Sequence, residues 1–101
     1  MVTRNTRLHP DALIPIGNTT VDTTNGSVSL TVPTGASGII MQNLGTAGSY
    51  WSFQLMSGSA TGFKFTTAKE VVWFSTQIPT IYLWLADADS IVYQFVAPVS
   101  Y

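Results

Sequence analysis

Few side chains in this 101-residue sequence are able to carry out acid, base or metal chemistry. There are four Lys and Arg, five Asp and Glu, one His and no Cys. The lack of Cys excludes a disulfide framework and a thiolate metal site. A net charge of −1 with so few basic residues is not the charge pattern of a nucleic-acid-binding protein. Catalysis would have to come from the carboxylates and the one imidazole.

Two catalytic arrangements are open to these groups. His9 could join a serine–histidine–aspartate triad only if the N-terminal segment folded back, so we expect it to lie against a neighbouring subunit instead. Glu70 could pair with Asp87 or Asp89 as the two carboxylates of a glycosidase. Asp87 and Asp89, however, lie where the chain needs a turn, and Asp is a favoured turn residue. Their spacing is also a weak match to a calcium loop. We therefore expect no catalytic, metal or cofactor site, and a protein that is not an enzyme.

Aromatic residues offer a different chemistry, the stacking of a ring on a ligand. Trp51, Trp73 and Trp84, with Tyr50 and Tyr82, could form a platform for sugar rings of the type that carbohydrate-binding β-sandwich modules use. Tryptophans in strands also serve as core or interface anchors. A carbohydrate-binding module therefore stays open as the alternative function.

Short strands must position all of these residues, because from residue 18 onward short apolar or alternating runs are separated by polar turns and no window has a helical period. We expect about eight strands, at residues 19–24, 27–32, 39–44, 50–56, 63–65, 70–74, 80–85 and 91–96. Asn25-Gly26 is typical of a type I′ turn and predicts a hairpin between the first two strands. The fold class is therefore all-β, an antiparallel β-sandwich, with jelly-roll and Ig-like strand orders both open.

Residues 1–17 differ from this pattern, and we expect them to form an extended N-terminal arm beside a single sandwich domain at residues 18–101. The segment contains both arginines, the His and two prolines, Pro10 and Pro15, and proline does not suit a central strand. It has no apolar core of a secretory signal. We expect a protein made in the host cytoplasm without a signal peptide.

Three of the later strands are apolar on both faces, at residues 71–74, 81–85 and 91–96. A sandwich strand normally has one face in water, so a second apolar face indicates a surface that something else covers. It could be covered by the N-terminal arm or by a partner. Charged residues make up 9% of the chain, against about 25% in ordinary domains, and interface centres are depleted in charge in the same way.

Two stretches of the chain, residues 31–45 (TVPTGASGIIMQNLG) and 74–84 (FSTQIPTIYLW), resemble small virion proteins of tailed bacteriophages. These are cysteine-free β-sandwiches of the capsid decoration or cement type, and the resemblance covers residues 28–97. It implies a structural protein of the virion capsid surface that binds the major capsid protein and itself, with a homotrimer favoured. A neck or tail virion protein has a similar composition and is a further alternative. The resemblance transfers no functional residue to this sequence. We expect neither a nucleic-acid partner nor a membrane partner.

The residues expected at partner or subunit interfaces come from the arm and from the doubly apolar strands. They are Arg4, Arg7, His9, Leu13, Ile14, Ile16, Trp73, Tyr82 and Trp84.

Overall fold

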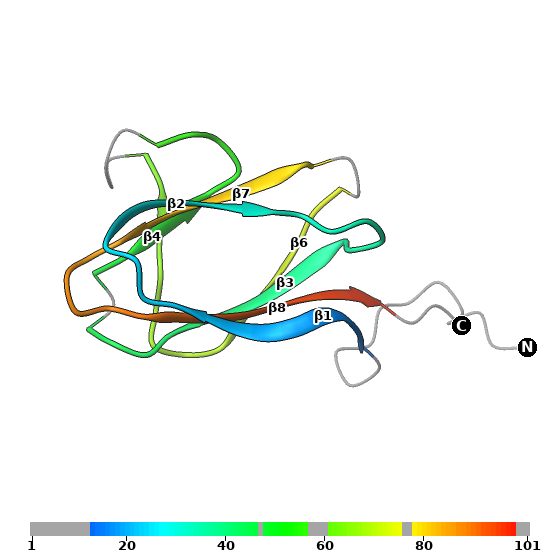
Figure 1. Ribbon diagram of the computed structural model, residues 1–101, viewed down its shortest axis with the longest axis horizontal. Coiled ribbons are helices and arrows are strands. Elements are labelled where there is room, and N and C mark those ends of the chain that lie inside the picture. The colour runs from blue at the N-terminus through cyan, green and yellow to red at the C-terminus, as the bar shows by residue number, and fades with distance from the viewer. Residues whose placement is uncertain (1–12, 47, 57–60, 76–77, 99–101) are drawn as a thin grey trace, which may run out of the picture.

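The computed structural model contains eight β-strands in two antiparallel sheets of four (Figure 1). It describes residues 13–46, 48–56, 61–75 and 78–98. The strands are β1 (Leu13–Asp22), β2 (Gly26–Thr31), β3 (Gly38–Asn43), β4 (Tyr50–Ser52), β5 (Phe63–Lys64), β6 (Glu70–Trp73), β7 (Thr80–Leu85) and β8 (Ile91–Pro98). Sheet A has the order β1-β8-β3-β6, and sheet B has the order β2-β7-β4-β5. The expected all-β antiparallel sandwich is confirmed.

The strand pairs are nested, and this nesting decides the topology. β1 pairs with β8, β2 with β7, β3 with β6, and β4 with β5. The chain is thus one long hairpin, rolled up so that successive strands of each arm alternate between the two sheets. This is the jelly-roll order, one of the two orders that the sequence left open. Only β4 and β5 are neighbours both in sequence and in a sheet.

The expected hairpin at Asn25-Gly26 is wrong. β1 and β2 lie in different sheets, so this segment carries the chain from sheet A to sheet B. Gly26 has the positive φ of +92° that the dipeptide suggested, and the Thr24 N–H donates to Asp22 Oδ1 at 2.8 Å. Asn25 does not share the positive φ, because Ala88 is the one non-glycine described residue that has it, so the type I′ turn is not formed either. Ile16 and Val28 pack on the same core from opposite sheets, which the hairpin pairing would not allow.

The domain begins earlier than residue 18. Residues 13–17, which the sequence assigned to the arm, form the first half of β1, where Leu13 to Ile16 lie opposite Pro98 to Phe95. Pro15 is tolerated because β1 is an edge strand. The register breaks between Ile16 and Thr20, where Gly17 has a φ of +79°. Arg4, Arg7 and His9 lie outside the described residues.

β4 is shorter than expected and ends at Ser52. The Ser52 hydroxyl accepts a hydrogen bond from the Gln54 N–H at 3.0 Å, which turns the chain out of the sheet. As a result Leu55 is 76% exposed and does not share the inner face with Trp51, contrary to the alternating pattern. Phe53 stays inside through an edge-to-face contact with Trp51, at a ring distance of 5.2 Å.

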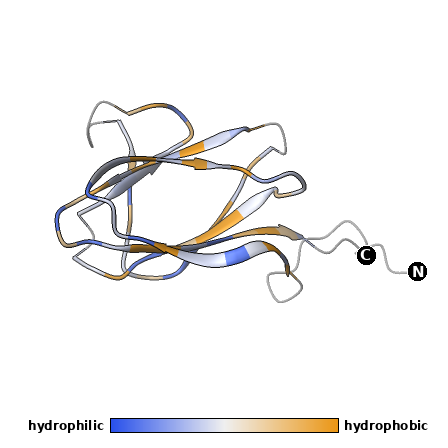
Figure 2. Ribbon diagram, viewed as in Figure 1, coloured by the Kyte–Doolittle hydropathy of each residue, from blue (hydrophilic) through white to orange (hydrophobic). Residues whose placement is uncertain are grey.

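The core lies between the two sheets and takes alternate residues from each strand. Hydrophobic residues recur along β3, β7 and β8, whereas hydrophilic residues lie mostly at the turns (Figure 2). The buried members are Leu30, Ala36, Ile39, Met41, Trp51, Phe65, Ile81, Leu83, Leu85, Ile91 and Phe95. The residues that alternate with the inward-facing ones in β3, β7 and β8 point to the two outer faces.

Candidate functional site

The turn between β7 and β8 holds the one buried carboxylate of the described residues, that of Asp89, which is 4% exposed. Both of its oxygens accept hydrogen bonds from the segment that joins β3 to β4. Oδ1 accepts from the Thr46 N–H at 2.7 Å and from the Thr46 hydroxyl at 3.1 Å. Oδ2 accepts from Asn43 Nδ2 at 3.0 Å, the Gly48 N–H at 3.0 Å and the Ser49 hydroxyl at 2.8 Å. This set of contacts is called the Asp89 clamp below.

The clamp keeps Asp89 ionised. Burial by itself raises the pKa of a carboxyl group, but the hydrogen bonds from Thr46, Asn43 and Ser49 outweigh burial and hold the pKa of Asp89 well below its usual range. The position therefore supplies neither a protonated acid nor a free nucleophile, because all five bonds act on the charged form.

The glycosidase pair suggested by the sequence is not assembled around Asp89. Asp87 is exposed, and Glu70 lies in edge strand β6, where it accepts a hydrogen bond from the Thr66 N–H at 3.4 Å. The expected turn at Asp87 and Asp89 is present, and Ala88 adopts a positive φ of 67° within it. Within the described ranges, no three His, Asp or Glu side chains gather as metal ligands.

Sequence reasoning missed the clamp. Its donors come from residues 43–49, of which Gly45, Thr46, Gly48 and Ser49 form a small-residue run that looked only like a loop. A Cβ on Gly45 would overlap the Asp89 carboxylate, so the backbone must approach closely there. The only signal in the sequence was this combination of small and hydroxyl-bearing residues. It does not indicate that the acceptor is Asp89, which lies 43 residues after Thr46.

The outer face of sheet A is a candidate binding surface. Cross-strand register places Val21 beside Val92, and Val92 beside Gln42. The next row runs through Gln94, Ile40 and Val71, and a third through Val96, Gly38 and Trp73. These residues together are called outer face A: Val21, Gly38, Ile40, Gln42, Val71, Trp73, Val92, Gln94 and Val96. None of these nine side chains is charged, and those from β6 and β8 are apolar except Gln94.

Both glutamines of outer face A are already engaged by the protein. Gln94 Nε2 donates to the Gly17 carbonyl at 2.8 Å, and its Oε1 accepts from the Thr19 hydroxyl at 2.6 Å. These bonds fill the register break of β1. Gln42 Nε2 donates to the Thr67 carbonyl at 3.0 Å. The polar groups of this face are thus partly satisfied from within, and a partner need not supply matching charges.

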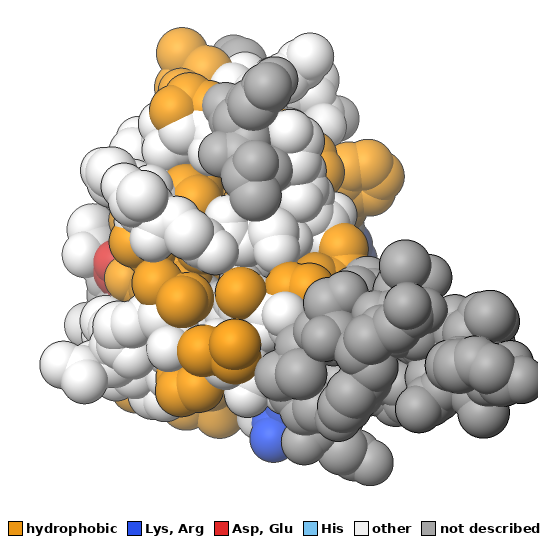
Figure 3. All heavy atoms as spheres, turned by 90° about the vertical axis from the view of Figure 1, so that its right-hand side faces the viewer, with side chains coloured by type: hydrophobic (Ala, Val, Ile, Leu, Met, Phe, Trp, Pro, Cys, Tyr) orange, Lys and Arg blue, Asp and Glu red, His pale blue; other side chains and the backbone are white. Residues whose placement is uncertain are grey.

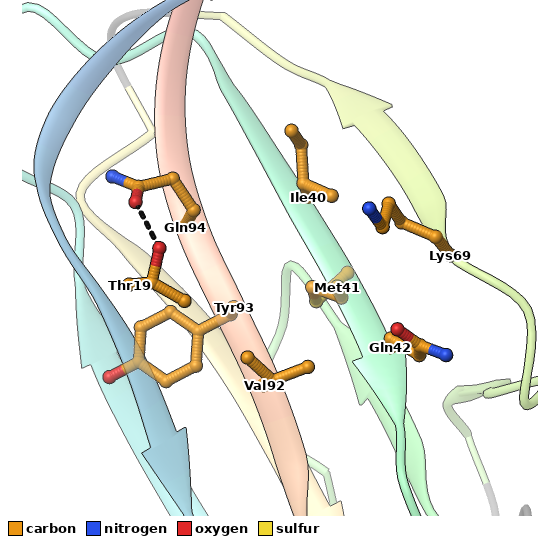
Figure 4. A pocket seen from close by; sticks show the side chains of 8 residues that line it. All are labelled: Thr19, Ile40, Met41, Gln42, Lys69, Val92, Tyr93 and Gln94. Atoms are coloured by element: carbon orange, nitrogen blue, oxygen red, sulfur yellow. Dashed lines mark hydrogen bonds between the residues drawn. The ribbon is translucent and has the colours of Figure 1, made fainter.

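A shallow groove of about 320 Å³ lies on this surface, lined by residues of β1, β3, β8 and the segment before β6 (Figure 4). Lys69 is the one charged residue of its lining, at the margin of outer face A. Tyr93 also contributes to the lining, and burial together with the Asp22 carboxylate raises the pKa of Tyr93. The groove has no cluster of reactive groups, and its chemistry is that of packing.

The three tryptophans do not form one platform. Trp51 is in the core, with Phe63 at a ring distance of 4.9 Å. Trp73 lies half-buried on outer face A, where it packs so closely over Gly38 that a Cβ there would overlap its ring. Trp84 lies half-buried on the outer face of sheet B, beside Tyr50 in the neighbouring strand.

The other expected interface residues are also divided between surfaces. Tyr82 lies on the outer face of sheet B, opposite Ser29 and Ser52. Within β1, Ile14 is 47% exposed, Leu13 is half-buried, and Ile16 packs against the core. The structure thus separates Trp73 from Tyr82 and Trp84, which the sequence had grouped together.

Comparisons with known proteins give no relative. No family model matches the chain, and searches of curated proteins and of solved structures find no match either. Among the described residues there is also no helix long and apolar enough to cross a membrane.

Replacing Asp89 with Asn should destabilise the fold. The amide would place an N–H₂ group where the carboxylate now accepts hydrogen bonds, and it would remove the charge from all five contacts. We expect the free energy of unfolding in urea to fall by about 3 kcal/mol or more. Asp87→Asn, in the same turn but exposed, should change it by less than about 0.5 kcal/mol. Equal effects of the two variants would contradict the clamp.

The clamp also predicts how stability depends on pH. The folded pKa of Asp89 is depressed, so its contribution is fully present above the unfolded pKa of about 3.9 and is lost as the pH falls toward the folded value. The free energy of unfolding should therefore decline below about pH 5, and more steeply in the natural protein than in Asp89→Asn. Parallel pH profiles for the two proteins, measured by urea unfolding, would contradict this assignment.

Proposed function

We propose that this chain is a non-enzymatic structural protein of a tailed-bacteriophage virion, a capsid cement or decoration protein that attaches to the major capsid protein. The observation that carries the proposal is outer face A, whose nine residues come from four strands and include no charged side chain, with Lys69 at its margin. A free-standing domain gains nothing from an apolar face in water. A protein that packs on a shell of many subunits gains the burial of that face at each contact.

The physical mechanism would be adhesion. Apolar burial contributes about 25 cal/mol per Å², and a flat sheet face can meet a second flat surface over its whole area. The partner surface would be apolar and uncharged like outer face A, because a charge left opposite it would be desolvated without a partner. A shell presents many equivalent sites, so linked copies would bind with avidity.

Apolar side chains also gather at one end of the sandwich (Figure 3). Figure 3 views the end at which β1 begins and β8 ends, and hydrophobic side chains gather across its described part, with few charged ones among them. Exposed or half-buried apolar residues at the strand ends there include Ile14, Val32 and Ile78. A contact that covered both outer face A and this end would be larger than the sheet face alone.

The strand order is compatible with this role. Jelly rolls are common in viral capsid proteins, and also in lectins. The fold by itself assigns no function, so the weight of the proposal rests on the charge-free face.

A charge placed in outer face A tests the proposal. Val71 is 40% exposed and lies beside Ile40, so Val71→Lys should leave the fold intact. It should weaken attachment to shells of the cognate major capsid protein at least about tenfold, as measured by co-sedimentation. Thr24→Lys, which adds the same charge at the exposed β1–β2 connection, is the matched control.

The same assay separates the alternatives. Shell binding by Val71→Lys equal to that of the natural protein would contradict a role for outer face A. Binding of the natural protein to isolated necks or tails, and not to shells, would replace the capsid role with the other virion location.

A second candidate function, the binding of carbohydrate, is favoured by the aromatic residues on the outer face of sheet B. Tyr50 and Trp84 are cross-strand neighbours, and Tyr82 lies on the same face. Hydroxyl groups of Ser27 and Ser29 flank them. Aromatic faces carry partial negative charge and can meet the C–H face of a pyranose, and hydroxyls can bond its substituents.

Trp84→Ala tests this candidate. If the surface binds sugars, glycan titration should shift the tryptophan fluorescence of the natural protein and not that of Trp84→Ala. Trp73→Ala, on the opposite outer face, should keep the response. The absence of any shift in the natural protein across a range of hexose polymers would contradict carbohydrate binding.

A further inference from the structure

The sandwich has four edge strands, and three of them are poorly suited to pair with another chain. β1 contains Pro15 and a register break. β5 has two residues, one of which is Lys64. β6 has four residues and begins at Glu70, directly after Lys69. Proline, irregular register, short length and charge are the features by which proteins protect sheet edges from further pairing.

β2 has none of these features. Its six residues, Gly26–Thr31, include no charge and no proline, and they pair with β7 in continuous register from Gly26 opposite Leu85 to Thr31 opposite Thr80. Within the described part of the chain, no other strand pairs with β2. Among the described residues, its second edge therefore has a regular register and no strand partner.

The backbone direction identifies the groups at this open edge. The Val32 N–H donates to the Pro79 carbonyl of the β7 side at 2.9 Å, and the direction of N–H and C=O groups alternates along a strand. The N–H and C=O groups of Ser27, Ser29 and Thr31 thus point away from β7. These are three donors and three acceptors in an unbroken row.

We propose that β2 pairs antiparallel with β2 of a second copy across a two-fold axis, and so joins the two B sheets into one eight-stranded sheet. Ser29 would lie opposite Ser29 of the second copy, and Ser27 opposite its Thr31. This register uses all six open backbone groups of each strand. It also keeps the exposed hydroxyls on the outer face and Val28 and Leu30 on the core side.

A second copy is the occupant that the strand itself favours. In a two-fold pairing, a charged residue near the axis would lie close to the same residue of the second copy, and like charges opposite each other destabilise a sheet. β2 avoids this repulsion because it has no charged residue. The three outward side chains are small hydroxyl residues, Ser27, Ser29 and Thr31, all exposed, so they can lie opposite one another without a clash.

This inference does not rest on the proposed capsid role. Because β2 belongs to sheet B, the pairing leaves outer face A of both copies uncovered, and the dimer would present two such faces to a shell. The symmetry differs from the trimer that the resemblance implies, and the two are distinguishable by mass.

Charge substitutions at Ser29 test the pairing. Light scattering after size-exclusion chromatography should show a dimer for the natural protein. Ser29→Lys and Ser29→Glu should each weaken the dimer at least about tenfold, because like charges would lie directly opposite. An equimolar mixture of the two variants should restore it. Thr34→Lys, exposed in the turn after β2, should remain a dimer.

A cysteine at the same position gives a second, independent readout. Hydrogen-bonded antiparallel pairs have Cα atoms about 5.5 Å apart, a distance that a disulfide spans. The natural chain has no Cys, so mild oxidation of Ser29→Cys should give a covalent dimer, and oxidation of Thr34→Cys should not.

Three results would overturn the pairing. They are a monomer or a trimer for the natural protein at high concentration, a Ser29→Lys dimer as tight as the natural one, and a mixture of the two charged variants that does not reassociate. The shell assay with Val71→Lys gives a separate answer, since that substitution lies on the other sheet.

Discussion

The buried charge of Asp89 is the constraint on which the arrangement of this sandwich depends most. A carboxylate removed from water must be surrounded by donors, and here five donors come from the crossing between β3 and β4. That crossing passes from sheet A to sheet B, and the turn that carries Asp89 passes from β7 in sheet B back to β8 in sheet A. The clamp thus joins the two crossovers at one end of the sandwich. Ser49 strengthens the joint, because its hydroxyl also accepts from the Ala86 N–H at 2.9 Å and its carbonyl accepts from the Phe65 N–H at 2.9 Å.

With the ends of the sheets held in this way, strand alternation gives the two outer faces different chemistry. Residues next to core positions in β3, β6 and β8 are mostly apolar, and they form the charge-free outer face A. The same alternation in β2, β4 and β7 places aromatic and hydroxyl residues outward on sheet B. The small number of charged residues therefore has a different consequence on each outer face. It leaves one face suited to packing against an apolar partner and the other to a ligand or surface that accepts hydrogen bonds.

The open edge of β2 adds a third, directional surface. The faces can pack on a partner in many orientations, whereas a strand edge fixes register through its backbone groups. A protein that pairs with itself through an edge and adheres to a partner through a face can be both oriented and multivalent. The proposed edge pairing and the proposed face contact would be compatible, because outer face A and β2 lie on opposite sheets and neither contact would block the other.

The sequence by itself determined the local features. The sequence pattern identified all eight strands, though β1 begins six residues earlier than expected, and it placed β7 at Thr80–Leu85. It also indicated the doubly apolar strands, two of which, β6 and β8, contribute outward residues to outer face A. Only the tertiary structure decided the pairing. Asn25-Gly26 joins two sheets and forms no type I′ hairpin, and Leu55 left the inner face because Ser52 ends β4. Asp89 lies in the expected turn, but its carboxylate is buried and bonded to the β3–β4 segment. The physical reason is that alternation reports only which side of a strand is buried. Which strands are neighbours, and which donors a carboxylate finds, depends on contacts between residues some forty positions or more apart, for which neighbouring residues carry no signal.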